Sequence, residues 1–250
     1  FSIASYMGRI NYGFDNKYLL TLTGRYDGAS QLAEGNKWAF FPSAAIGWRM
    51  SEESFVQGLG VFNNLKLRVS YGEVGNNASI SPYATQANIF QTFYDFDGTP
   101  SLGYTINALS NQGIVWERSK EINVGLDFSL SGLPISGTVE YYKRNTEDLI
   151  LDDKVPNSTG FNNVLGNVGE IENSGIEVSL NTVNVNKGDF RWSSNLTFTA
   201  NDDKVVKLAG GLTEDIGNAR FVGESVRAYY TYKFEGIWQL GQEAEAAEFG

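Results

Sequence analysis

Alternation of apolar and polar residues between Lys17 and Asp27 constrains the fold of this chain more than any other stretch. One face of the segment is apolar and runs from Tyr18 to Tyr26, while the opposite face becomes polar toward Arg25. A repeat of two residues is typical of a β-strand with one apolar face. An apolar row that begins and ends in tyrosine is also typical of a strand that crosses a membrane within a β-barrel.

The same pattern returns along the chain and divides it into strands and connections. The expected strands lie near residues 3–14, 17–27, 38–50, 65–71, 121–130, 135–141, 176–181, 190–199 and 230–238. Short turns alternate with long loops, as they do in outer-membrane barrels. The sequence therefore predicts an all-β fold, an antiparallel up-and-down transmembrane β-barrel, of which this chain supplies an incomplete segment of about nine strands with long external loops.

Composition removes several classes of function. The chain has 250 residues, a formal net charge of -10, no cysteine and no histidine. Thiolate and imidazole nucleophiles and metal ligands are therefore absent, and we expect no enzyme, no cofactor and no metal site. The acidic balance argues against nucleic acid as a partner, because phosphate binding requires clustered lysine and arginine. The chain opens in a strand pattern at Phe1 without a signal peptide, so we expect its natural N-terminus to lie upstream.

Aromatic residues gather at the ends of the predicted strands and form two girdles, as in membrane barrels. At the short-turn ends they are Tyr12, Phe14, Tyr18, Trp48, Trp192 and Trp238, and at the long-loop ends they are Tyr26, Trp38, Tyr71, Trp116, Tyr141 and Tyr230.

Charged residues within the predicted strands fall on the face opposite the apolar row. A charged side chain at the bilayer midplane costs roughly 2 to 4 kcal/mol on the lipid face of a barrel, so this face is predicted to line the lumen. A structural ion network that braces the wall is the favoured interpretation of these charges, and direct contact with substrate is the alternative. The predicted lumen-facing residues are Arg9, Arg25, Arg68, Asp127, Glu140 and Arg191.

The stretch from Gly72 to Val115 shows no sustained alternation and is predicted to be a long external loop. Its aromatic side chains suit contact with a substrate or a protein partner, and the other interpretation is that they pack the loop onto itself. They are Phe90, Phe93, Tyr94, Phe96 and Tyr104.

Other charged residues lie at strand ends and in loops. Arg118 and Lys120 continue the lipid-facing row, where they are either solvated or in contact with lipopolysaccharide phosphates. Paired carboxylates are interpreted as solvated loop charges rather than as a calcium or catalytic site. These pairs are Asp95/Asp97, Asp152/Asp153, Glu170/Glu172 and Asp202/Asp203.

Over essentially its whole length the chain resembles the SusC/RagA family of TonB-dependent outer-membrane transporters of Gram-negative bacteria, and five motifs carry the resemblance. They are GRINYGFDNKYLLTLTGRYDGAS at 8–30, FFPSAAIGWR at 40–49, LKLRVSYGEVGN at 65–76, WERSKEINVGLD at 116–127 and GNVGEIENSGIEV at 166–178.

The resemblance implies a barrel of roughly 22 strands with a plugged lumen, a segment that contacts TonB, and a SusD-like lipoprotein that closes over the external loops. The expected function is import of oligosaccharides or peptides across the outer membrane, with outer-membrane lipid and lipopolysaccharide around the barrel. Residues 1–250 are then part of a single barrel domain. Plug, TonB-contacting segment and closing strands lie outside this sequence, so the segment is expected to form a curved sheet with two open edges.

Two other classes of function remain as alternatives. The first is a surface or soluble carbohydrate-binding β-protein that resembles an adhesin and does not transport. The second is a hydrolase that displays its loop carboxylates.

Overall fold

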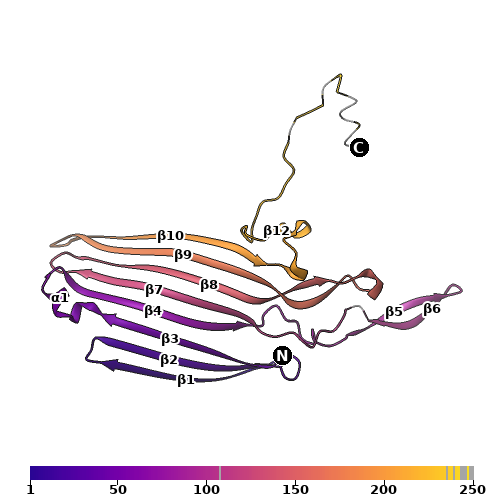
Figure 1. Cartoon of the computed structure of the whole chain (residues 1–250), viewed down its shortest axis with the longest axis horizontal. Coiled ribbons are helices and arrows are strands. Elements are labelled where there is room, and N and C mark those ends of the chain that lie inside the picture. The colour runs from indigo at the N-terminus through magenta and orange to yellow at the C-terminus, as the bar shows by residue number, and fades with distance from the viewer. Residues whose placement is uncertain (107, 235, 239, 243–246, 248–250) are drawn as a thin grey trace.

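The computed structural model describes residues 1–106, 108–234, 236–238, 240–242 and 247. It is built around an antiparallel sheet of eight strands in the order β1-β2-β3-β4-β7-β8-β9-β10 (Figure 1). These strands are β1 (Ile3–Phe14), β2 (Tyr18–Ala29), β3 (Trp38–Arg49), β4 (Phe62–Asn76), β7 (Glu117–Leu130), β8 (Ile135–Lys154), β9 (Asn163–Lys187) and β10 (Phe190–Lys207). Neighbours in sequence are neighbours in the sheet, which confirms the predicted up-and-down topology.

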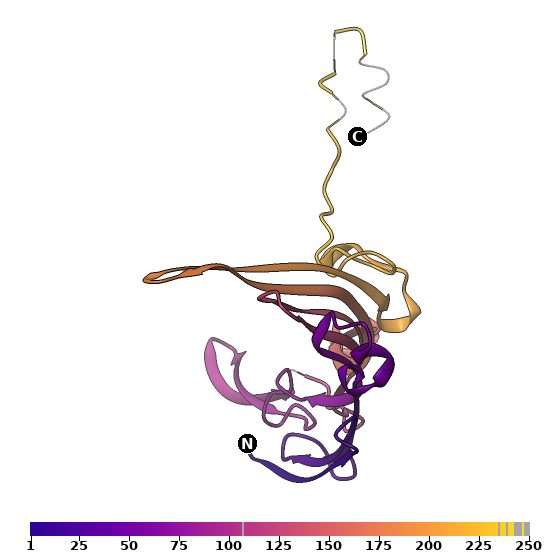
Figure 2. The same ribbon diagram turned by 90° about the vertical axis from the view of Figure 1, so that its left-hand side faces the viewer.

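The sheet curls into an open arc when it is seen along its strands (Figure 2). Its two edges are β1 and β10, which do not pair with each other in the described part of the chain. A single sheet that curls in this way has one face toward the inside of the arc and one toward the outside. The predicted segment of a barrel wall is therefore confirmed.

In the described part of the chain, helical structure is confined to short segments outside the main sheet. A 3-10 turn (η1, Met50–Glu52) and one α-helical turn (α1, Ser54–Gln57) join β3 to β4, and η2 (Asn157–Thr159) lies between β8 and β9. Two further turns, η3 (Ala209–Gly211) and η4 (Ile216–Asn218), follow β10 together with the short strands β11 (Glu214–Asp215) and β12 (Arg220–Phe221). Among the described residues, no helix is long and apolar enough to cross a membrane.

The register of the strands places apolar residues of all eight strands on the same face of the sheet. Residues that pair across neighbouring strands point to the same side, so the pairing can be followed from one edge to the other. One such row consists of Tyr12, Leu20, Ile46, Val69, Val124, Tyr141, Ile176 and Ala200. Most of its large side chains are exposed to the surroundings of the protein. This side of the sheet, called the apolar face below, is therefore not the core of a soluble sandwich.

The main buried core lies instead at the long-loop end of the sheet, where the connections fold over one another. Its members are Ala29, Leu32, Phe41, Ile80, Ile114, Trp116 and Ile150. Trp116 is only 5% exposed, its ring meets that of Phe41 edge-on at 5.7 Å, and its indole N–H donates to the Lys37 carbonyl at 3.0 Å. The prediction that Trp116 belongs to the lipid-facing girdle is therefore wrong, because the loops cover its ring.

The predicted long loop between Gly72 and Val115 contains a hairpin that the sequence analysis missed. Strands β5 (Ile89–Phe96) and β6 (Thr99–Ile106) pair with each other and project beyond the end of the sheet (Figure 1). The turn between them is Asp97-Gly98, and both residues have positive φ, at 54° and 77°. An Asp-Gly turn flanked by apolar residues is a strong hairpin signal, which could have identified this element.

Two other predicted boundaries also differ from the structure. Strands β8, β9 and β10 extend well into the predicted loops 149–169 and 201–226. Outside the membrane both faces of a strand meet water, so pairing continues there after the alternation of side chains has faded.

The predicted strand over 230–238 is wrong for the described residues. Tyr230, Tyr232 and Phe234 lie in an irregular segment that leads away from the sheet (Figure 1), and Glu235 lies outside the described residues. Alternation of residues predicts the two faces of a strand, but a strand forms only where its backbone can hydrogen-bond to a neighbouring strand. None of the sheets among the described residues includes this segment.

We predict that Trp116→Ala loosens the external loops. The lost side chain leaves a cavity in the loop core that costs about 3 to 5 kcal/mol, so loops 28–37 and 77–88 should be cleaved faster in limited proteolysis of the full-length protein in detergent. Trp38→Ala is the matched control, because Trp38 stacks on Tyr26 at 4.9 Å on the apolar face. Equal cleavage rates for the two variants would contradict the role given to the loop core.

Candidate functional site

All six charged residues that were predicted to line the lumen lie on one side of the sheet, called the polar face below. Cross-strand pairing and alternation place Arg9, Arg25, Arg68, Asp127, Glu140 and Arg191 opposite the apolar row. A hollow of about 520 Å³ on this face is lined by residues from β2 to β8, including Thr21, Ser70 and Arg144. The polar side chains of several neighbouring strands thus contribute to one hollow.

Three of the six charges form one cluster near the middle of the sheet. The Arg68 guanidinium on β4 donates from Nε and Nη2 to both carboxylate oxygens of Asp127 on β7, at 2.8 and 2.9 Å. Its Nη2 also donates to Glu140 Oε1 on β8 at 2.5 Å. A planar guanidinium is suited to this arrangement, because it can hold one carboxylate in bidentate fashion and reach a second. The cluster joins the side chains of neighbouring strands in addition to their backbone ladders.

Gly125 allows Arg68 to cross β7. In the register of the sheet Gly125 lies directly between Arg68 and Glu140. A Cβ atom at Gly125 would lie 2.9 Å from Nη2 and 3.1 Å from Cζ of Arg68. A methyl group there would require the end of the Arg68 side chain to shift. The sequence analysis did not identify Gly125, because a glycine within a strand gives no signal of what crosses above it.

The polar face beside this cluster is rich in groups that form hydrogen bonds. A second hollow of about 350 Å³ is lined by Glu121, Asn123, Tyr142, Arg144, Asn173 and Glu177. Arg144 donates to Glu121 at 2.7 Å, and the Tyr142 hydroxyl donates to Asn201 at 2.9 Å. Glu177 pairs directly with Glu140 across β8 and β9, so a further carboxylate lies beside the two that Arg68 binds. Such a surface can bind polar molecules or cationic groups by hydrogen bonds and charge.

The remaining predicted lumen residues do not join the cluster. Arg9 Nε donates to Thr23 Oγ1 at 3.1 Å, and Arg25 Nε donates to Asp27 Oδ1 at 2.7 Å within its own strand. Arg191 lies at the short-turn end of β10, near its first residue. The polar face is thus a wall of separate small networks rather than one site.

Girdle residues on the strands lie on the apolar face as their alternation requires. Those that are largely exposed there are Tyr12, Tyr18, Tyr26, Tyr71, Tyr141 and Trp192. Trp48 is half-buried, and its indole N–H donates to Glu53 at 3.1 Å. Tyr230 and Trp238 lie outside the strands, and the Tyr230 ring packs against Phe221 at 5.2 Å.

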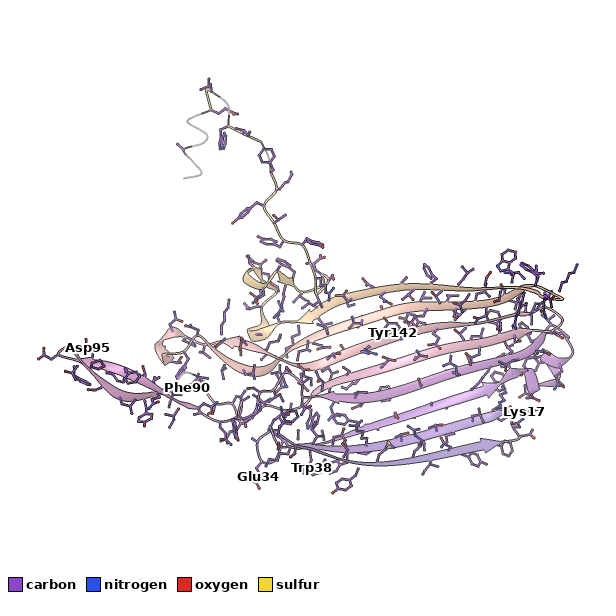
Figure 3. The ribbon with its side chains drawn as sticks, turned by 180° about the vertical axis from the view of Figure 1, so that it is seen from behind. Lys17, Glu34, Trp38, Phe90, Asp95 and Tyr142 are labelled. Carbon is purple, nitrogen blue, oxygen red and sulfur yellow. The ribbon has the colours of Figure 1, made fainter. Side chains whose placement is uncertain are left out.

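The external hairpin divides the predicted aromatic contact residues between its two faces. Phe93 and Tyr104 lie on one face together with Ile89, Leu102 and Ile106, and every one of these side chains is exposed. Tyr94 and Phe96 lie on the other face, with Phe90 at the base of the hairpin (Figure 3). The first face, called the hairpin apolar face below, has no protein cover in the described structure. On the other face the Tyr94 ring packs over Gly103 of the paired strand, so the loop packs part of this aromatic set onto itself.

Carboxylates toward the long-loop end of the sheet are engaged by cations and backbone groups. Glu172 accepts from Lys143 and Lys204, both at 2.9 Å. Asp203 accepts from the Val226 N–H at 2.8 Å. Among the described residues, no group of three or more acidic side chains is placed to hold a metal ion.

Arg118 and Lys120 are also paired. Arg118 Nη1 donates to Glu73 at 2.7 Å, and Lys120 Nζ donates to Glu147 at 2.6 Å, on the row of the apolar face beyond Ile122. Both cations are thus held by carboxylates at the edge of the apolar belt.

We predict that Gly125→Ala destabilises the barrel wall. The added methyl group should separate Arg68 from Glu140 and lower the free energy of unfolding by about 1 to 3 kcal/mol, as measured by urea unfolding of the full-length protein in lipid vesicles. Gly8→Ala is the matched control, since Gly8 lies on β1 and no atom lies within 4 Å of a Cβ built there. A loss no larger than that of Gly8→Ala would show that Gly125 does not serve this crossing.

Comparisons with known proteins agree with this architecture. The family model described as TonB dependent receptor-like, beta-barrel, matches residues 2–246. TonB-dependent receptor P26 of Formosa agariphila is 41% identical over 99% of this chain and 26% of its own length. TonB-dependent receptor SusC of Bacteroides thetaiotaomicron is 33% identical over 93% of this chain and 25% of its own length.

A solved structure has the same fold over most of the chain. The RagAB peptide importer in its open-open state superposes with a TM-score of 0.80 at 28% identity, over 89% of this chain and 24% of the matched one. This chain thus spans about a quarter of the length of the relatives that it matches. It belongs to the TonB-dependent receptor β-barrel family of the bacterial outer membrane, and it resembles a segment of the SusC and RagA transporter barrels.

Proposed function

We propose that the complete protein imports a large nutrient, an oligosaccharide or a peptide, across the outer membrane with energy delivered through TonB. This chain contributes part of the wall of a single barrel domain and several external loops. It has no catalytic role in the proposal, and the polar groups of its wall serve to bind and pass a solute. The description of RagAB as a peptide importer and the relationship to SusC support transport of this class.

The polar face is the proposed lining of the lumen. Its serine, threonine, asparagine and paired charged side chains offer many weak hydrogen bonds, which hold a polar solute without trapping it. The apolar face, with its exposed tyrosines, is the proposed lipid-facing surface. This assignment places the cluster of Arg68, Asp127 and Glu140 inside the barrel, where water and the plug can solvate it.

The observation that carries the proposal is the hairpin apolar face, which projects beyond the end of the sheet and is not covered by any of the residues that the structure describes. Figure 3 shows Asp95 at its far tip and Lys17 at the opposite end of the molecule. Large uncovered apolar patches on a protein mark interaction sites. A SusD-like lipoprotein that closes over the external loops is the proposed occupant. Between Val74 and Val115 the charged residues are Asp95 and Asp97 alone, so the occupant should offer an apolar patch beside lysine or arginine.

Phe93→Asp should weaken capture of the lipoprotein, because it places a charge on the hairpin apolar face. Thr92→Asp is the matched control, since it places the same charge on the other face of the same strand. Co-purification of the lipoprotein with the full-length receptor in mild detergent measures the effect, and we expect loss in the first variant and retention in the second. Equal retention in both would contradict docking at this face.

Transport itself is tested by uptake of fluorescent oligosaccharides and oligopeptides into cells. We expect uptake of one of the two classes to require both this protein and TonB, and to stop when the proton-motive force is collapsed. Uptake that persists without TonB, or binding of solute without any uptake, would contradict the proposed transport and favour a surface binding protein.

A further inference from the structure

The connection between β3 and β4 is held in place by one carboxylate. Glu53, between η1 and α1, accepts hydrogen bonds from Lys17 Nζ at 3.2 Å, the Tyr18 hydroxyl at 2.8 Å and the Trp48 indole N–H at 3.1 Å. These donors come from the β1–β2 turn and from the adjacent ends of β2 and β3. The connector, residues 50–61, is thus tied to three consecutive elements at the short-turn end of the sheet.

The same bonds show on which side of the sheet the connector lies. Tyr18 and Trp48 are directly opposite one another in the sheet, and both belong to the apolar face. A side chain that bonds to both must lie over that face. The connector therefore folds toward the lipid-facing side and away from the lumen.

Two apolar side chains of the connector are exposed, and one of them lies against Trp48 of the apolar face. Phe55 is 59% exposed and its ring lies 6.4 Å from that of Trp48, while Leu59 is 62% exposed. Val56, in the same helical turn, is buried. The Val61 carbonyl accepts from the Ser131 N–H at 2.7 Å, which joins the connector to the neighbouring β7–β8 turn.

We propose that this connector is a membrane-interface anchor, with Phe55 and Leu59 inserted among the lipid headgroups and upper acyl chains of the periplasmic leaflet. Aromatic and aliphatic side chains beside paired charges are suited to this zone, where one end is apolar and the other is wet. The anchor sets how deeply the barrel sits in the membrane. The anchor would contact membrane lipid and not the transported nutrient, so this proposal goes beyond the proposed transport function.

The charges of the connector fit a position at the headgroups. Hydrogen bonds from Tyr18 and Trp48 lower the pKa of the Glu53 carboxyl, and the bond to Glu53 raises the pKa of Lys17. Both groups are therefore charged at neutral pH, and their side chains remain partly exposed to solvent. A paired acid and base at the water boundary hold the connector without placing an unpaired charge in hydrocarbon.

Spin labels on single cysteines test the proposal in the full-length protein reconstituted into phosphatidylethanolamine and phosphatidylglycerol vesicles. This part of the chain has no cysteine of its own. We expect a label at Phe55→Cys to collide more with oxygen, which concentrates in lipid, than with a water-soluble nickel complex. A label at Gln57→Cys, on the opposite side of the same helical turn, should show the reverse order. Equal collision patterns at the two positions would overturn the anchor.

A second variant tests the role of Glu53. Combining Glu53→Ala with the label at position 55 should shift the label toward the nickel complex, because the three donors lose their shared acceptor and the connector is freed. An unchanged pattern would mean that Glu53 does not hold the anchor. If the unsubstituted full-length protein shows no TonB-dependent uptake while the label at position 55 keeps its lipid signature, the proposed function fails and the anchor stands.

Discussion

Cross-strand register is the physical constraint on which this structure depends. A shift of one residue in any strand would exchange its two faces and put charged side chains among apolar ones. The observed register keeps the row from Tyr12 to Ala200 on one face of the whole eight-stranded sheet. Apolar side chains that are exposed in this way are stable in lipid and not in water, so register and membrane insertion specify each other.

The polar face carries charged side chains that little other protein covers. Each of these charges therefore requires a hydrogen-bonding or ionic partner. Arg68 pairs with Asp127 and Glu140 at the same time, and Gly125 leaves the space in which the Arg68 side chain passes over β7. Charged residues beyond the apolar belt are paired in the same way, as Glu172 is with two lysines. Paired charges thus occur both on the polar face and at its rim, while exposed apolar side chains form the apolar face and the hairpin apolar face.

Alternation of residues was sufficient to predict the eight strands of the sheet, their order and the two faces, because a residue's face depends on local spacing alone. Alternation was insufficient where contacts between distant segments determine whether a side chain is buried. Trp116 was assigned to the long-loop girdle ahead of the predicted strand 121–130, and only the folding of separate loops around Phe41 shows that it is buried. The crossing of Gly125 by Arg68 likewise depends on register between strands. The hairpin at Asp97-Gly98 was predictable from its turn residues, but alternation alone did not reveal it.

The most direct test of the central claim is an accessibility scan along β2 in the full-length protein in lipid vesicles, with one spin-labelled cysteine at a time from Leu19 to Thr23. Labels at Leu20 and Leu22 should collide mainly with oxygen in the lipid, and labels at Thr21 and Thr23 mainly with a water-soluble nickel complex. A repeat of two residues with this phase is the result expected of a barrel wall. Water access at Leu20 and Leu22, or no alternation at all, would contradict it.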